Sequence, residues 1–140
     1  MSDPAPLLLD THAAIWAVED QPIAAAANEV IDDAYRTGRA IFVSAISAWE
    51  VGLLVSRNRL GLSTTPERWF QRLLSIDGVQ LAELSPDILI ASSLLPGEPP
   101  RDPADRIIIA TARDLGAVLI TRDRLLLKYG EAGQVSTIAC

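Results

Sequence analysis

Three short runs made only of apolar residues constrain the fold of this chain most strongly. They are residues 7–9 (LLL), 40–43 (AIFV) and 117–120 (AVLI). Apolar runs of this length without polar alternation are typical of central strands in a parallel sheet that helices cover on both faces. Because longer helical segments separate them, the sequence predicts an α/β fold. We expect a three-layer α/β/α sandwich on a mainly parallel sheet of four to five strands.

The remaining segments supply helices and outer strands. We expect helices at 13–18, 22–36, 45–57, 66–75, 86–95 and 103–115, a short helix ending near residue 129, and weaker strands at 79–84 and 135–138. Prolines at the first turn and glycines after the last support several of these boundaries, with Pro22 starting the second helix and Gly38 ending it. Ser44, directly after a strand, is expected to cap the next helix. No internal repeat is present, so we expect one domain spanning residues 1–140.

Composition narrows the classes of function. The net charge of −6 argues against a general coat for nucleic acids, because such coats neutralise phosphates with Lys and Arg. A nuclease is still possible, because a bound metal ion can neutralise a cluster of acids locally, and the net charge of the chain does not reveal such a site. Cys140 is the only cysteine, which excludes an internal disulfide and a Cys/His zinc site. No signal-peptide pattern or membrane-spanning stretch is found, so we expect a soluble, cytoplasmic protein without a membrane partner.

Four acids are placed where the ends of these strands would meet. Asp10 ends the first strand, Asp123 follows the fourth, Glu50 lies in the helix after the second, and Asp105 lies in the first turn of the helix before the fourth. In open α/β sheets the ligand crevice lies at the carboxyl edge of the strands. We therefore expect all four carboxylates to converge there.

Carboxylates gathered in this way need a cation. Their like charges repel, so they resist being ionised together unless a positive ion neutralises them. Oxygen-only ligands favour a hard ion such as Mg²⁺ or Mn²⁺. Such an ion can generate hydroxide and stabilise the charge that develops on a phosphodiester. The pattern therefore predicts metal-assisted phosphodiester hydrolysis.

Each acid also has a purely structural explanation. Asp10, Asp102 and Asp123 stand where helices begin and can serve as N-caps. Asp105 lies in a first turn, where the helix dipole favours an acid. Ser47 and Glu50 match a capping box, but a helix that starts at Ser44 leaves Glu50 unexplained by capping. Asp102 is interpreted as a cap only. For the other four, placement at one edge of the sheet favours a shared functional role.

Four ordered stretches also resemble a known family. LLLDTHAAIW, SAISAWEVG, DPADRIIIATA and LITRD are similar to the motifs of PIN-domain ribonucleases, especially the VapC-type toxins of bacterial toxin-antitoxin pairs. The resemblance spans nearly the whole chain, with the motifs in the family's order. It implies a parallel α/β/α sandwich, an RNA substrate, Mg²⁺ or Mn²⁺ as cofactor, a homodimer, and inhibition by a cognate antitoxin protein.

The resemblance also assigns roles to residues. It implies that the catalytic, metal-binding acids are Asp10, Glu50, Asp105 and Asp123, with Thr11, Ser44 and Thr121 as polar neighbours. His12 is given no catalytic role, since a lone histidine is more often a packed or hydrogen-bonding residue.

Two surfaces are candidates for contact with partners. Arg122 and Arg124 flank Asp123, so we expect them to contact RNA phosphates beside the metal. The segments 49–54 and 69–73 carry Trp49, Trp69 and several apolar residues. Core packing explains most of this bulk, and the remainder is a candidate groove for an antitoxin segment or a dimer contact.

Other enzyme classes fit less well. A haloacid-dehalogenase-like phosphatase needs a second aspartate where this chain has His12, and a receiver domain needs a lysine closer to the late strand than Lys128. The glycine-rich phosphate loop of nucleotide-binding proteins is missing. The remaining alternative is a catalytically inactive PIN-like binding module, and the intact acids at all four motif positions count against it.

Overall fold

The structure is a computed structural model that describes residues 4–19 and 24–140. These residues form a five-stranded sheet in the order β3-β2-β1-β4-β5, in which every strand pair is parallel. The strands are β1 (Leu7–Leu9), β2 (Ile41–Ser44), β3 (Val79–Ala82), β4 (Val118–Thr121) and β5 (Ser136–Ala139). The three apolar runs supply the three central strands, as the sequence predicts.

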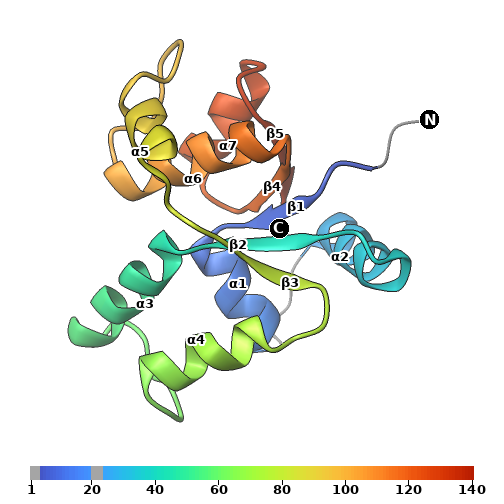
Figure 1. The fold of residues 1–140 in the computed structure, drawn as a ribbon, viewed down its shortest axis with the longest axis vertical. Helices are drawn as coiled ribbons and strands as arrows, with labels where there is room; N and C mark the ends of the chain where they lie inside the picture. The colour runs from blue at the N-terminus through green and yellow to red at the C-terminus, as the bar shows by residue number, and fades with distance from the viewer. Residues whose placement is uncertain (1–3, 20–23) are drawn as a thin grey trace.

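Helices cover both faces of this sheet. They are α1 (Thr11–Val18), α2 (Ala25–Thr37), α3 (Ile46–Ser56), α4 (Pro66–Leu74), α5 (Pro86–Ser93), α6 (Pro103–Leu115) and α7 (Arg124–Glu131). Figure 1 shows α5, α6 and α7 on one side of the sheet and α1, α2 and α4 on the other. The expected three-layer α/β/α sandwich is therefore confirmed. Within the described residues, no helix has the length and apolar character needed to cross a membrane.

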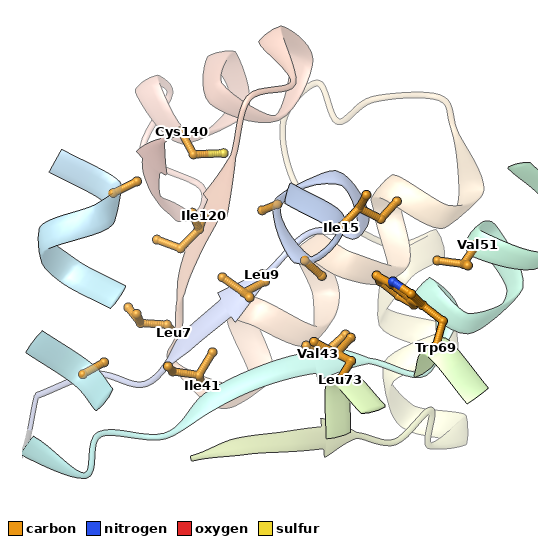
Figure 2. Close-up of a cluster of buried hydrophobic side chains, with 14 residues drawn as sticks. Leu7, Leu9, Ile15, Ile41, Val43, Val51, Trp69, Leu73, Ile120 and Cys140 are labelled. Carbon is orange, nitrogen blue, oxygen red and sulfur yellow. The ribbon is translucent and has the colours of Figure 1, made fainter. Parts of the chain in front are cut away.

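Alternation along β1 divides the core into two clusters. Leu7 and Leu9 point to one face, where they pack with side chains of α1 to α4, including the buried Trp69 (Figure 2). Leu8 points to the other face and packs against Ile108 of α6 and residues of α7. Side chains of a strand alternate between its two faces, so a wholly apolar strand is the expected result of burial on both.

Several boundaries differ from the expected ones by one to three residues. Helix α1 begins at Thr11 instead of residue 13, because the Asp10 carboxylate accepts a hydrogen bond from the Ala13 amide and caps the helix. Strand β4 runs through Thr121, which leaves Asp123 two residues beyond its end. Gly38 ends α2 in the left-handed conformation, with φ of 74°, as predicted. The predicted start of α2 at Pro22 lies outside the described residues.

The expectation that Ser44 caps the third helix is wrong in its details. Ser44 is the last residue of β2, and α3 begins at Ile46 after Ala45, whose side chain makes no capping hydrogen bond. The Ser44 hydroxyl still accepts a hydrogen bond from the Ile46 amide, at 3.1 Å. Ser44 therefore helps the chain to turn from the strand into the helix, from a position inside the sheet.

The two aromatic segments considered for partner contacts have different environments. Trp69 in α4 is only 2% exposed, and its indole N–H donates to Glu19 Oε1 at 2.9 Å. Trp49 in α3 is 59% exposed. Core packing thus accounts for Trp69, while Trp49 is available for contact with another molecule.

Candidate functional site

A pocket of about 430 Å³ at the carboxyl end of the sheet collects the four predicted acids. Its lining residues are Asp10, Thr11, His12, Trp16, Glu50, Asp102, Asp105, Ile108, Arg122 and Asp123. The structure therefore brings Asp10, Glu50, Asp105 and Asp123 together, as expected, and adds a fifth acid, Asp102. The pocket opens where β1 and β4 end, because the helices that follow these strands diverge to opposite faces.

Asp10 is both a helix cap and a wall of this pocket. Its Oδ1 atom accepts a hydrogen bond from the Ala13 amide at 2.8 Å, and its Oδ2 atom accepts one from the Thr121 hydroxyl. Asp10 is only 6% exposed. Burial raises the pKa of Asp10, and these two hydrogen bonds oppose the increase. Asp10 therefore caps α1 and lines the pocket at the same time.

Glu50 is held by the residue that follows Asp10. The Thr11 hydroxyl donates to Glu50 Oε1 at 2.6 Å and lies 2.8 Å from the hydroxyl oxygen of Ser47. Ser47 is buried inside α3 and bonds Thr11, so the capping-box explanation for Glu50 is wrong. Burial also raises the pKa of Glu50, and the bond from Thr11 lowers it in part.

The other three acids stand at the beginnings of helices. Asp102 caps α6 by accepting from the Asp105 amide at 3.0 Å. Asp123 caps α7, with Oδ1 accepting from the Leu125 amide at 2.8 Å and the Leu126 amide at 3.2 Å. The Asp102 cap was predicted as its only role and the Asp123 cap as an alternative to a functional role, and both residues line the pocket. Asp102 was missed as a lining residue, although its position one turn before Asp105 was a usable signal.

Asp105 has the most perturbed carboxyl group of the five. Burial, followed by the negative charges of Asp102, Asp123, Glu50 and Asp10, raises its pKa to about 7. Among the described residues, none donates a hydrogen bond to its carboxylate. Its protonation therefore depends first on burial and then on the charges around it, and a cation in the pocket would favour its ionised form.

The polar and basic neighbours fall into two groups. Thr11, Thr121 and Arg122 contact the acids or line the pocket with them. Ser44 is fully buried in β2, and Arg124 is exposed on α7; neither lines the pocket. His12 and Trp16 line its rim, although sequence reasoning gave neither a role.

The donors present suit a hard divalent cation. Every ionised side chain expected to act as a ligand offers carboxylate oxygen, the preferred ligand of Mg²⁺ and Mn²⁺. In the described parts of the chain, no three His, Cys, Asp or Glu side chains are yet close enough to hold a metal ion between them. Burial is the main cause that raises the pKa values of Asp10, Glu50 and Asp105, and the charges of neighbouring carboxylates raise them further. The residues therefore fit the ion in the chemistry of their donor atoms, and their side chains would have to draw closer together to bind it.

Known proteins resemble this chain in sequence and in fold. The family model described as the PIN domain matches residues 7–132. Ribonuclease VapC22 of Mycobacterium tuberculosis is 36% identical over 124 residues, which cover 88% of this chain and 91% of that protein.

Two solved structures share the fold at low sequence identity. The crystal structure of VapBC2 from Rickettsia felis, bound to a DNA fragment from their promoter, matches with a TM-score of 0.66 at 15% identity, covering 95% of this chain and 97% of that one. The DNA-bound VapBC structure from Salmonella typhimurium matches with a TM-score of 0.65 at 18% identity, covering 97% of this chain and 98% of that one.

Proposed function

This chain belongs to the PIN domain family, and we propose that it is a metal-dependent endoribonuclease that acts as the toxin of a toxin-antitoxin pair. The observation that carries the proposal is the convergence of Asp10, Glu50, Asp105 and Asp123 in one pocket. The similarity to Ribonuclease VapC22 supports RNA as the substrate. We propose that residues 1–140 act as a single nuclease domain.

The four acids would hold Mg²⁺ or Mn²⁺. When bound, such an ion lowers the pKa of a coordinated water and stabilises the negative charge that develops on a phosphodiester. Threonines hold Asp10 and Glu50 in place, because the hydroxyls of Thr121 and Thr11 each donate to one carboxylate oxygen. Supporting contacts of this kind commonly set the affinity and orientation of a metal ligand.

Asp123 and Asp105 would complete the ligand set from the other wall. One oxygen of Asp123 accepts from two amides at the start of α7, which fixes the side chain against the helix end. The Asp105 carboxyl, with its pKa near 7, exchanges a proton readily in neutral solution. A cation in the pocket favours its ionised form, so the site would become fully charged only when it is loaded.

We further propose an antitoxin protein as partner and a homodimer as the working assembly. The matched structures from Rickettsia felis and Salmonella typhimurium are VapBC structures, which supports the first of these partners. Trp49, exposed on α3 beside Glu50, is an aromatic side chain suited to such a contact.

Cleavage of RNA by the purified, partner-free protein tests the proposed activity. A total small-RNA pool is incubated with Mg²⁺, with Mn²⁺, or with a chelator, and the cut ends are sequenced. We expect discrete fragments that require the metal, and a loss of at least about a hundredfold in Asp10→Asn, because a neutral amide cannot supply the charge that holds the ion.

Asp87→Asn is the matched control. Asp87 is also an acid in the first turn of a helix, but it lies on α5 away from the pocket. This variant should cleave as the wild type does. Metal-dependent cleavage that survives in folded Asp10→Asn would contradict the proposed site, and an inert wild-type protein would favour the inactive binding module.

A further inference from the structure

Trp16 and Arg122 form a stacked pair at the rim of the acidic pocket. The Arg122 guanidinium carbon lies 4.0 Å from the centroid of the Trp16 ring. The two residues come from distant parts of the sequence, Trp16 from α1 and Arg122 from the turn after β4, and both line the pocket. A planar guanidinium over an indole face is a favourable cation–π arrangement.

Two further contacts fix the geometry of this pair. Arg122 Nε donates to the carbonyl oxygen of Cys140 at 3.0 Å. On the other partner, the His12 ring packs against Trp16 with centroids 5.7 Å apart and an angle of 44° between the planes. Trp16 is also partly buried against the core beneath α1. The guanidinium is therefore held by a backbone carbonyl and by a ring that packs against His12 and the core.

The position of Arg122 matters because of the charges next to it. A long, exposed arginine beside five carboxylates is attracted into the pocket, where it would compete with a metal ion. Held on the indole face, it presents its positive charge at the pocket entrance. An RNA strand approaching a chain of net charge −6 meets repulsion, so a fixed cation at that entrance favours binding of the strand.

We propose that Trp16 is a positioning residue that holds the Arg122 guanidinium at the pocket rim, where Arg122 binds a phosphate of the RNA strand adjacent to the one that is cleaved. This inference rests on the proposed ribonuclease function. In this proposal Arg122 contacts the phosphate, and Trp16 sets the position of the Arg122 guanidinium. Arginine is well suited to the task, because its planar N–H groups match phosphate oxygens in bidentate geometry.

The test measures kcat/KM for cleavage of a single-stranded RNA at several salt concentrations. In Arg122→Ala we expect about a tenfold lower kcat/KM, and a plot of log(kcat/KM) against log[salt] that is shallower by about 0.7, the effect of losing one phosphate contact on a single strand. Trp16→Leu keeps the apolar bulk and the arginine. It should lower kcat/KM by about twofold to fivefold, the size of an exposed cation–π contact, and make the plot shallower.

The matched variants separate positioning from simple damage. Trp16→Phe retains an aromatic face and should restore the wild-type salt dependence. Tyr35→Leu removes an exposed aromatic side chain on α2 that does not line the pocket, and it should leave the salt dependence unchanged. The double variant Trp16→Leu/Arg122→Ala should be no worse than Arg122→Ala alone. A wild-type salt dependence in folded Trp16→Leu, or additive losses in the double variant, would overturn the proposal.

A second measurement separates this inference from the proposed function. If the wild-type protein cleaves no RNA, the proposed function fails before any variant is compared. The Arg122 Nε–H signal in a ¹⁵N NMR spectrum then decides the positioning. A signal displaced by the ring current of Trp16, retained in Trp16→Phe and lost in Trp16→Leu, supports it; an undisplaced signal in the wild type overturns it.

Discussion

The two walls of the pocket hold their acids in different ways. On one wall are the threonine-bonded acids, Asp10 and Glu50, which accept hydrogen bonds from Thr121 and Thr11. On the other wall are the helix-start acids, Asp102, Asp105 and Asp123, which stand at the beginnings of α6 and α7. All five carboxylates share one pocket, so the difference lies in what supports them.

The two sets of acids should therefore respond differently to a cation. Asp10 is buried and Glu50 is half-buried, and the hydroxyl donors of these two acids fix oxygen positions before any ion arrives. Asp105 receives no hydrogen bond from the described residues, and its pKa of about 7 reflects burial and the charge of its neighbours. The first wall is therefore preorganised, whereas on the second wall Asp105 responds to the charge in the pocket.

Removing the Thr11 hydroxyl should reduce RNA cleavage more than any other change that distinguishes the two walls. Thr11→Val keeps the shape of the side chain but removes the donor to Glu50. We expect RNA cleavage to fall by about tenfold to a hundredfold, with weaker Mn²⁺ binding, because supporting contacts of metal ligands typically have effects of this size. Single-turnover cleavage at a series of Mn²⁺ concentrations measures both quantities.

Thr111→Val is the control for that substitution. Thr111 is equally buried, but its hydroxyl donates to the Ile107 carbonyl within α6. A similar loss of cleavage in both folded variants would mean that Thr11 acts through general stability. In that case the first wall is not preorganised by its hydroxyls.

The raised pKa of Asp105, on the second wall, should make the stability of the folded protein depend on pH. The folded protein binds the Asp105 proton more tightly than the unfolded chain, since the pKa rises from 3.8 to about 7. The resulting stabilisation is complete below pH 3.8 and is lost as the pH rises to about 7. At pH 8 in chelator, the ionised carboxyl therefore destabilises the fold by roughly 1–2 kcal/mol, after allowance for solvent screening.

Asp105→Asn removes this titration. At pH 8 we expect the variant to be more stable than the wild type by roughly 1–2 kcal/mol in urea unfolding. This difference in the free energy of unfolding should disappear near pH 4. Asp87→Asn controls for the loss of an acid in a first helical turn. A stability difference for Asp105→Asn that stays constant between the two pH values would rule out charge as its cause.

Asp102 should give the smallest effect. Its carboxylate caps α6, and asparagine caps a helix about as well, so Asp102→Asn should change stability by only a few tenths of a kcal/mol. Asp102→Ala removes the cap and should cost about 1 kcal/mol in urea unfolding. Equal stability of the two variants would show that the hydrogen bond to the Asp105 amide contributes little.

The sequence was most informative where the structure depends on local pattern. The apolar runs ended at the residues that place Asp10 and Asp123, because burial on both faces of a strand leaves a direct trace in the sequence. Pro66, Pro86 and Pro103 likewise began their helices as predicted. These signals depend on neighbours within a few residues, so they could be interpreted without a structure.

The features that escaped prediction depend on contacts between distant segments. Ser44 belonged to the strand because β2 pairs with β3 through that residue. Trp16 and Arg122 meet only after β1 and β4 have paired at the centre of the sheet. Asp102 was interpreted as a cap, which is correct, but its place in the pocket depends on how α6 is oriented over the sheet. Sequence spacing alone does not encode these placements.

A Mn²⁺ titration by isothermal calorimetry shows whether the two walls together bind a divalent cation. At pH 8 we expect saturable binding to the wild type and unchanged binding in Asp87→Asn. Binding should be much weaker in Asp10→Asn and in Asp105→Asn, one from each wall. It should also weaken below pH 7, as Asp105 becomes protonated. If the wild type binds no Mn²⁺, or if all four proteins bind it with equal affinity, the carboxylates do not form a shared cation site.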